Sequence, residues 1–188
     1  RGDDEGARDV MLSHDRAREM LSYLEKYEYA SLEHIVWVIL AQTGMRTGGL
    51  RALDVEDYHP EAEDPYLAVR PSPDEGTGLK NETDGARYIS ISESACKVLD
   101  DYLEDKRPDV TDEYGREPLL ATTHWRIGRA TVRKYAYKWT RPCAIGDECP
   151  HGKDVATCEA AGGADSASKC GSSRSPHPVR RGYITHEL

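Results

Sequence analysis

The sequence predicts a mainly α-helical domain of the α+β class with one small antiparallel β-sheet. Three serines each precede a stretch with helical spacing of apolar residues, where a side-chain oxygen can cap a helix. Two short stretches alternate apolar and polar residues, as half-buried strands do. The length of 188 residues suits one domain with a full hydrophobic core, and the sequence shows no internal repeat.

The first two helices follow from their caps. Ser13 is expected to cap a helix that runs to about Tyr27, and Ser31 to cap a second one over residues 32–43. The second helix is apolar on all sides at its centre, which predicts that it is buried. Gly44 is well suited to end it in a left-handed conformation. The apolar residues expected on one face of the first helix are Ala17, Met20, Leu21 and Leu24.

The sheet and two further helices follow. Residues 66–70 and 87–91 are predicted strands, joined by a long polar loop. Ser92 is expected to cap the next helix, and another spans roughly residues 129–139. Cys96 lies on the apolar side of the helix after Ser92 and is expected to be a buried thiol. The other apolar positions of that helix are Ala95, Val98, Leu99, Tyr102 and Leu103.

Two segments differ from this pattern. Residues 1–12 are polar and are interpreted as a linker, so the domain is assigned to residues 13–188. Residues 142–176 hold four of the five cysteines together with much Gly, Ala and Ser, and are interpreted as an insertion within that domain. The last helix is expected to begin near Pro176.

Charge and hydropathy limit the classes of function. No apolar run is long enough to span a bilayer and no signal peptide is recognisable, so a cytoplasmic protein without membrane association is expected. The net charge of -9 disfavours nucleic-acid binding, which normally depends on a basic surface. However, acids concentrated in loops and outer helix faces, few lysines and no Phe also suit a halophilic protein. In molar salt only local charge counts, so a basic pocket could work inside an acidic shell. The acidic residues in question are Asp3, Asp4, Glu5, Glu61, Glu63, Asp64, Asp100, Asp101, Glu104 and Asp105.

Two distant segments carry the candidate chemistry. The stretch Thr43-Gly44-Met45-Arg46 follows the buried helix, and His177 and Arg180 lie three residues apart in the last one. At that spacing the two side chains leave the same face of a helix. Guanidinium groups bind phosphate oxygens bidentately and keep their charge at any accessible pH. Convergence of the two arginines and the histidine would therefore suit a phosphate that gains charge during a reaction.

These two segments resemble the signature boxes of the tyrosine recombinases, the phage-integrase family, and specifically its haloarchaeal branch. The resemblance implies a catalytic domain that cuts and rejoins double-stranded DNA through a 3′-phosphotyrosine intermediate, without a catalytic cofactor. Arg46 and Arg180 would hold the scissile phosphate, and His177 would donate to a nonbridging oxygen or assist proton transfer. Lys80, in the loop between the two strands, would protonate the departing 5′ oxygen. A tetramer on DNA is the family expectation.

The match departs from the family in three places. Gly49 stands where an acidic residue usually supports the first arginine, and Arg181 follows Arg180 where histidine is usual. The nucleophilic tyrosine of the family lies some tens of residues beyond the second box, whereas this sequence ends eight residues after Arg180. The sequence is therefore interpreted as a catalytic-domain fragment without its nucleophile. Tyr183, the one tyrosine near Arg180, is expected to belong to the core or to support the site. Such a fragment is expected to be inactive on its own.

The insertion suggests a metal site. Clustered cysteines in a cytosolic protein favour metal over disulfides, although their spacing matches no standard zinc finger. A segment with so few apolar residues would gain a staple from tetrahedral Zn²⁺. Three alternatives stay open: zinc held by four cysteines, zinc held by three cysteines and His151, and no metal. The four cysteines are Cys143, Cys149, Cys158 and Cys170.

Two other functions remain possible on the sequence alone. The chain could be a non-catalytic DNA-binding or regulatory relative, which the Gly49 departure and the acidic composition favour. It could also be a zinc-stapled interaction module in which the arginines are incidental.

Overall fold

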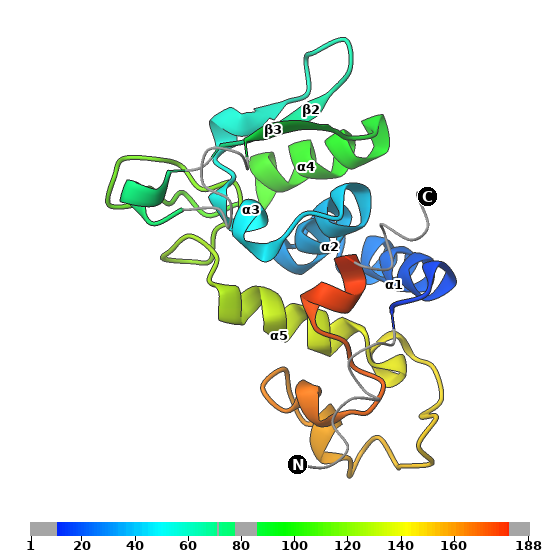
Figure 1. Ribbon diagram of the computed structural model, residues 1–188. Helices are drawn as coiled ribbons and strands as arrows, with labels where there is room; N and C mark the ends of the chain where they lie inside the picture. The colour runs from blue at the N-terminus through cyan, green and yellow to red at the C-terminus, as the bar shows by residue number, and fades with distance from the viewer. Residues whose placement is uncertain (1–10, 71, 78–85, 181–188) are drawn as a thin grey trace.

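The computed structural model describes residues 11–70, 72–77 and 86–180, and it has the predicted mainly helical architecture with one small sheet (Figure 1). The sheet and α4 lie at one end of the molecule, the cysteine-rich residues 142–176, interpreted above as an insertion, lie at the other, and α2 lies between them. The α-helices are α1 (His14–Tyr27), α2 (Leu32–Thr43), α3 (Thr47–Ala52), α4 (Glu93–Asp105) and α5 (Arg129–Trp139). The strands are β1 (Tyr58–His59), β2 (Tyr66–Val69) and β3 (Arg87–Ser90). The 3-10 turns are η1 (Val55–Asp57), η2 (Pro73–Glu75), η4 (Pro142–Ile145), η5 (Glu159–Ala161) and η6 (Ala167–Lys169).

The three predicted serine caps are confirmed. The hydroxyls of Ser13, Ser31 and Ser92 each accept the backbone N–H three residues later, at the start of α1, α2 and α4. Each cap satisfies one of the donors that a helix leaves unpaired in its first turn. Gly44 ends α2 with a left-handed φ of 54°, also as predicted.

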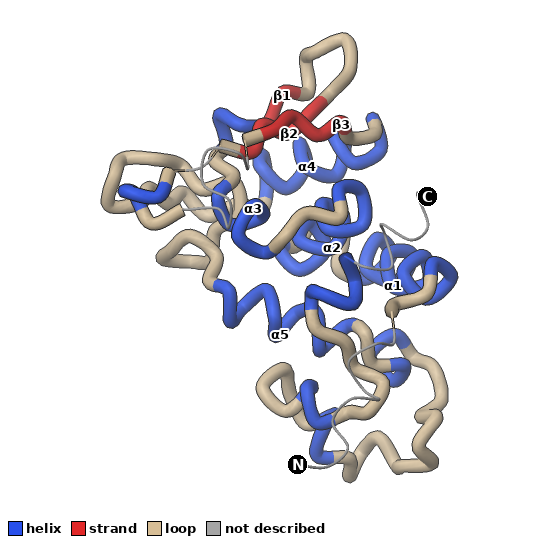
Figure 2. Tube along the Cα trace, in the orientation of Figure 1, coloured by secondary structure: helices blue, strands red, loops and turns tan. Residues whose placement is uncertain are grey.

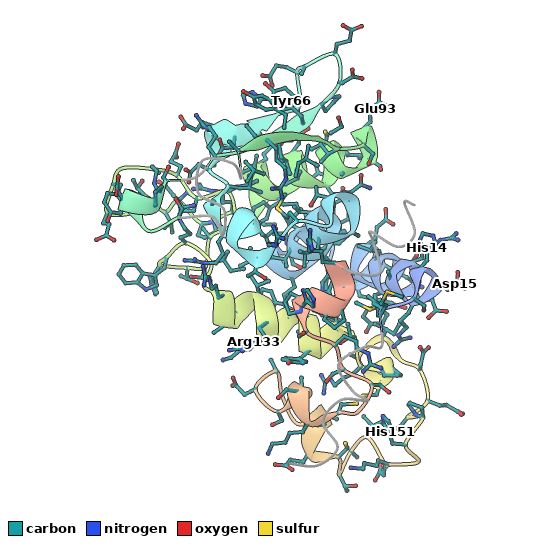
Figure 3. All side chains as sticks on the ribbon, in the orientation of Figure 1. His14, Asp15, Tyr66, Glu93, Arg133 and His151 are labelled. Atoms are coloured by element: carbon teal, nitrogen blue, oxygen red, sulfur yellow. The ribbon has the colours of Figure 1, made fainter. Side chains whose placement is uncertain are left out.

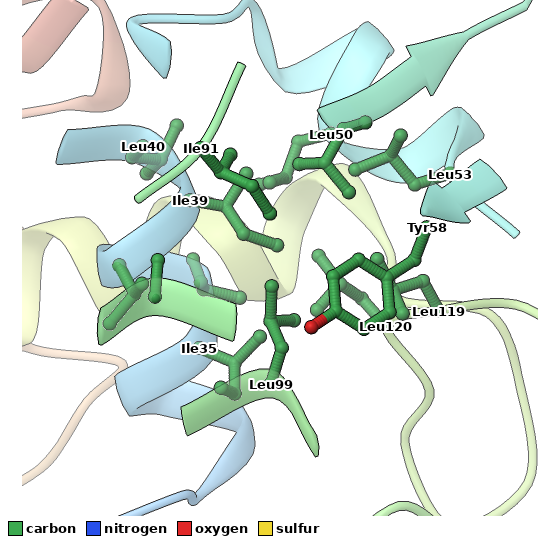
Figure 4. Packing of buried hydrophobic residues seen from close by; sticks show 14 of the residues in the cluster. Ile35, Ile39, Leu40, Leu50, Leu53, Tyr58, Ile91, Leu99, Leu119 and Leu120 are labelled. Carbon is green, nitrogen blue, oxygen red and sulfur yellow. The ribbon is translucent and has the colours of Figure 1, made fainter. Parts of the chain in front are cut away.

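The core lies on both sides of α2, whose residues from Ile35 to Leu40 are all buried. One side packs against the sheet, α3 and α4 (Figure 4). The other side packs Trp37 against α1 and α5. A helix that is apolar all round suits this central position, because each of its faces is covered. Cys96 is buried in the first cluster, as expected, and burial raises the pKa of its thiol.

The sheet is antiparallel with the order β1-β2-β3 (Figure 2). Val69 pairs with Arg87 at one end of the hairpin formed by β2 and β3. The sequence patterns did not predict β1 or α3. β1 has two residues and α3 has six, including two glycines, so neither is long enough to show a periodic pattern.

A buried ion network ties the segment after α3 to the loop before α5. Arg126 donates to Asp54 Oδ1 at 2.5 Å and to Asp112 Oδ2 at 2.9 Å, and its side chain is only 9% exposed. It also donates to the carbonyls of Arg51 and Leu53, at 2.9 and 3.2 Å. One guanidinium thus bridges two segments more than 70 residues apart in the chain, and removing it would leave Asp54 without its guanidinium partner and Asp112 with Arg116 alone.

The two carboxylates of this network respond differently to burial. Burial raises the pKa of Asp54, and its interaction with Arg126 does not offset that effect. Burial alone would also raise the pKa of Asp112. However, hydrogen bonds from Arg126 and Arg116 have the larger effect and hold this pKa far below its usual range. The difference arises because Asp112 accepts from two guanidinium groups and two backbone N–H groups.

Acid is expected to weaken the fold through Asp112. Its folded pKa lies below its ordinary value of 3.8, so its stabilising contribution is present above that pH and is lost as the pH falls below it. Urea unfolding measured between about pH 5 and pH 2 should show the native chain losing about 1.5–3 kcal/mol more than Asp112→Asn. Equal losses in the two proteins would contradict this role of the carboxylate.

Replacing Gly44 is expected to destabilise the link between α2 and α3. At its φ of 54° a Cβ approaches the carbonyl oxygen, so Gly44→Ala should lower the free energy of unfolding by about 1–2 kcal/mol. Gly44→Asn is the matched control, because asparagine tolerates the left-handed region better. Urea titrations of the two variants compare them directly, and an alanine variant as stable as the native chain would contradict the argument.

No helix in the described part of the chain is long and apolar enough to cross a bilayer.

Candidate functional site

Arg46 lies at the N-cap position of α3, held between two buried anchors. Met45 and Leu50, on either side of it in sequence, are almost completely buried. The turn before it is held by Thr43, whose hydroxyl donates to the carbonyl of Ile39 at 2.7 Å and accepts from the N–H of Met45 at 3.2 Å. The side chain of Arg46 is exposed, and it makes no hydrogen bond or ion pair with the residues that the structure describes. The backbone at this arginine is therefore positioned while its guanidinium group is left available.

The other end of α3 is fixed to the segment before α5. Arg51 donates from Nε to the carbonyl of Ile127 at 2.8 Å, and Arg126 donates back to the carbonyl of Arg51. These reciprocal bonds hold α3 in place, and with it the position of Arg46.

Gly49 faces the core and not Arg46. A Cβ at this position would lie 3.5 Å from Val69 Cγ1 and 3.9 Å from Met45 Sδ, both ordinary contact distances with apolar atoms. A carboxylate there would have to extend from apolar packing. In this chain, hydrogen bonds from the guanidinium groups of Arg51 and Arg126 to main-chain carbonyls hold α3, where the resemblance led us to expect an acidic residue.

Residues 176–180 form the start of the last helix, as predicted from Pro176. Val179 anchors this turn, because it is buried among side chains of α1, α2 and α5. The approach to the turn is also fixed: the N–H of Arg174 donates to Thr140 Oγ1 at the end of α5, at 2.7 Å. In Figure 1 the turn lies in front of α2, between α1 and α5.

Arg180 lies within the electrostatic reach of two other arginines. Burial lowers the pKa of its guanidinium, and the positive charges of Arg46 and Arg87 lower it further. Its Nε is buried without a hydrogen-bond partner in the described part of the chain. Residues from α3, β3 and the last helix thus gather three like charges. Such a group is unfavourable by itself and becomes favourable when an anion joins it.

Arg87 is the member of this group that sequence reasoning missed. It is the first residue of β3, exposed, and paired in the ladder with Val69. Its strand was predicted, but no pattern in the sequence indicated that the start of this strand would lie near Arg180. The one feature of the sequence that could have suggested Arg87 as a site residue is its place at the start of a short strand beside the polar loop.

The other two predicted site residues are His177 and Lys80. His177 is exposed at the start of the last helix, one turn before Arg180. Lys80 lies outside the described residues, within the connection between β2 and β3. That connection begins and ends at the Val69–Arg87 end of the ladder. The structure thus places Arg180 within electrostatic reach of Arg46 and of Arg87.

This arrangement is suited to binding a compact anion with several oxygens. Guanidinium groups offer fixed, paired donors that match phosphate geometry, and three of them can contact different oxygens of one group. Positive charge organised before the reaction also stabilises a phosphorus centre whose oxygens become more negative.

The insertion forms a separate site at the far end of the molecule, where His151 lies away from the sheet (Figure 3). Its four cysteines are half-buried and free of disulfides. They line one cavity of about 160 Å³ together with His151. In the described part of the chain, no three His, Cys, Asp or Glu side chains are grouped closely enough to hold a metal ion as they stand.

Comparison with known proteins shows the fold. No family model matches the sequence, and no curated protein matches it. Among solved structures, a XerH site-specific recombinase bound to its difH substrate matches 95% of this chain with a TM-score of 0.61 and 14% identity. XerA recombinase matches the whole chain with a TM-score of 0.55 and 17% identity. The Tn1549 transposon integrase in complex with transposon end DNA matches 98% with a TM-score of 0.63 and 17% identity.

The chain therefore has the fold of tyrosine-recombinase catalytic domains, the class predicted from its two arginine boxes. It spans 41% of the XerH chain, 67% of the XerA chain and 55% of the Tn1549 integrase chain that it matches.

Proposed function

We propose that this chain is catalytic-domain sequence of a site-specific DNA recombinase or integrase of the tyrosine type, from the haloarchaeal branch. The observation that carries the proposal is that Arg180 lies within electrostatic reach of both Arg46 and Arg87, on a fold shared with site-specific recombinases. The substrate is a phosphodiester of double-stranded DNA, whose negatively charged oxygens suit guanidinium donors.

The reaction is a transesterification at phosphorus. A tyrosine hydroxyl attacks the scissile phosphate, a bond forms between the phenolic oxygen and phosphorus, and the bond to the 5′ oxygen breaks. The 5′ oxygen leaves as a hydroxyl, with its proton supplied by Lys80. Attack by a 5′ hydroxyl of another strand reverses these steps and rejoins the DNA. The nucleophilic tyrosine is proposed to lie outside this chain.

The three arginines act on the phosphate throughout. Arg46 and Arg180 bind the nonbridging oxygens and stabilise the extra charge of the pentacoordinate transition state. Arg87 adds a third positive charge from the sheet side. His177 donates to a nonbridging oxygen or accepts the proton of the attacking tyrosine, for which its exposed position leaves room.

The acidic composition is compatible with this proposal. Described acids such as Glu61, Glu63, Asp64 and Glu104 are exposed around the sheet and α4, while the arginines gather between α3, β3 and the last helix. In concentrated salt, repulsion between those acids and DNA is screened over a few ångströms. We therefore propose a halophilic, cytoplasmic enzyme that assembles as a tetramer on its DNA.

The test uses the chain extended to its natural C-terminus, at high salt, with a nicked DNA duplex that traps the covalent intermediate. A denaturation-resistant protein–DNA band that disappears in Arg46→Ala is expected. DNA binding without such a band would favour the non-catalytic relative, which the glycine at position 49 keeps as a second candidate. A folded protein with no affinity for DNA would overturn both functions.

A further inference from the structure

Four cysteines line the cavity in residues 142–176. Cys143, Cys149, Cys158 and Cys170 all line it, although 26 residues lie between the first and the last. All four are half-buried, and none forms a disulfide. Thiols that are distant in sequence have thus been gathered around one space of about 160 Å³.

Apolar packing does not explain why the insertion is ordered. Between residues 142 and 172 only Ala160 and Ala167 are buried, and each contributes a single methyl group. Fixing the backbone costs about 1–2 kcal/mol per residue, far more than two methyl groups offset. The backbone hydrogen bonds of its turns join residues only three to five positions apart, so they do not tie distant parts of the segment together. The insertion therefore needs another source of cohesion.

A buried cation borders the same cavity. Arg141 is 6% exposed and donates to the main-chain carbonyls of Lys138, at 3.1 Å, and Ala160. Among the described residues it forms no ion pair, so its buried charge has no anionic partner. Lys153 and Lys169 also line the cavity, and of these Lys169 pairs with Glu159. Burying a guanidinium charge without an anionic partner costs free energy, so a negative charge in this cavity would be stabilised by Arg141.

We propose that this cavity binds one Zn²⁺ through the Sγ atoms of the four cysteines. Each thiol loses its proton to solvent on binding, so four thiolates around one divalent ion carry a net charge of 2−. This charge compensates Arg141 and the neighbouring lysines. Thiolates favour zinc in tetrahedral sites, and such a site has a strong effect on the stability of a segment with little core. The four sulfur atoms already line one cavity, and they are proposed to move closer together when the metal binds.

His151 is assigned to the rim and not to the metal. It is exposed, and its Nε2 lies 2.9 Å from Ser172 Oγ. Its ring packs against Gly171, where an added Cβ would lie 3.2 Å from Cε1. The four cysteines share one degree of burial that His151 does not, which favours the four-thiolate set over three cysteines and a histidine.

The metal would also order the approach to the last helix. Ser173 donates to the carbonyl of Cys170 at 2.8 Å, and the next residue, Arg174, is bonded to Thr140. Only two residues then separate Arg174 from His177. Zinc at Cys170 thus fixes the chain that leads into the arginine site, although its own binding does not depend on the function proposed for that site.

The test measures zinc directly on the 188-residue chain. Elemental analysis of the purified protein should give about one zinc per chain. Alkylation of the native protein should spare the four cysteines until a strong chelator is added. Co²⁺ in place of zinc should give the visible absorption of a tetrahedral thiolate site. Cys158→Ser should lose the bound metal, whereas Cys96→Ser, which changes a buried thiol of the main core, should keep it. His151→Ala should also keep it.

Several results would overturn the proposal. The four cysteines could instead form two disulfides, and the intact mass would then be four hydrogens lower than that of the fully reduced protein. In that case disulfides, and not zinc, would hold the segment together. Four thiols that react equally fast with and without chelator would show that the cavity holds no metal. Zinc loss in His151→Ala would exclude the four-thiolate set. Circular dichroism of Cys158→Ser distinguishes loss of metal from general unfolding, because the five α-helices lie outside the insertion.

Discussion

Replacing Arg180 with alanine in the chain extended to its natural C-terminus is expected to lower the rate of DNA strand cleavage by about 100- to 1,000-fold. This arginine projects from a turn that Val179 anchors in the core, and it lies near Arg46 and Arg87. Its loss removes donors that strengthen as the phosphate gains charge, so catalysis should suffer more than binding. Single-turnover cleavage of a nicked substrate, beside an equilibrium binding titration, separates the two effects.

The controls for this experiment use the same residue type. Arg180→Lys keeps the charge but not the fork of donors, so it should recover only part of the rate. Arg18→Ala removes an exposed arginine of α1 and should leave cleavage unchanged. Full activity in Arg180→Ala would exclude this arginine from the phosphate site.

Replacing Arg126 with leucine is expected to lower the free energy of unfolding by about 3–5 kcal/mol. The substitution leaves Asp54 and Asp112 buried without their shared guanidinium, and it removes the donors to the carbonyls of Arg51 and Leu53. Because these bonds hold the end of α3, the variant should also bind DNA more weakly through a displaced Arg46. Urea unfolding at neutral pH measures the first effect.

Arg18→Leu is the matched control for stability, since exposed charges contribute little. We expect it to stay within about 0.5 kcal/mol of the native chain. If the two variants lost a similar free energy of unfolding, the buried network would contribute no more to stability than an exposed arginine does.

Local signals in the sequence predicted most of the secondary structure. The caps at Ser13, Ser31 and Ser92 and the left-handed Gly44 act within one helical turn, so they can be recognised without knowledge of the fold. The burial of α2 followed from its apolar surface on all sides. α3 and β1 were missed because both are too short for a periodic pattern, and contacts with α2, α5 and β2 stabilise them instead.

The candidate site was only partly predictable. Arg46, His177 and Arg180 were selected because they lie in motifs with fixed spacing, whereas Arg87 lies in no motif and was identified only from its electrostatic effect on Arg180. The roles of Arg46, His177, Arg180 and Lys80 stay predictions. The buried network around Arg126 could not be recognised in the sequence, since its members are separated by up to 75 residues and share no pattern.

The sequence by itself determined where the helices begin and end, which helix is buried, and which arginines and cysteines carry the candidate chemistry. These properties depend on neighbouring residues, because capping, helical periodicity and residue chemistry are local. Only the tertiary structure decided that Arg180 lies within electrostatic reach of Arg46 and Arg87, that Arg126 holds α3, and that the four cysteines share a cavity with a buried Arg141. Charge repulsion, burial and cavity shape depend on distances between segments far apart in the chain, and those distances exist only in the folded protein.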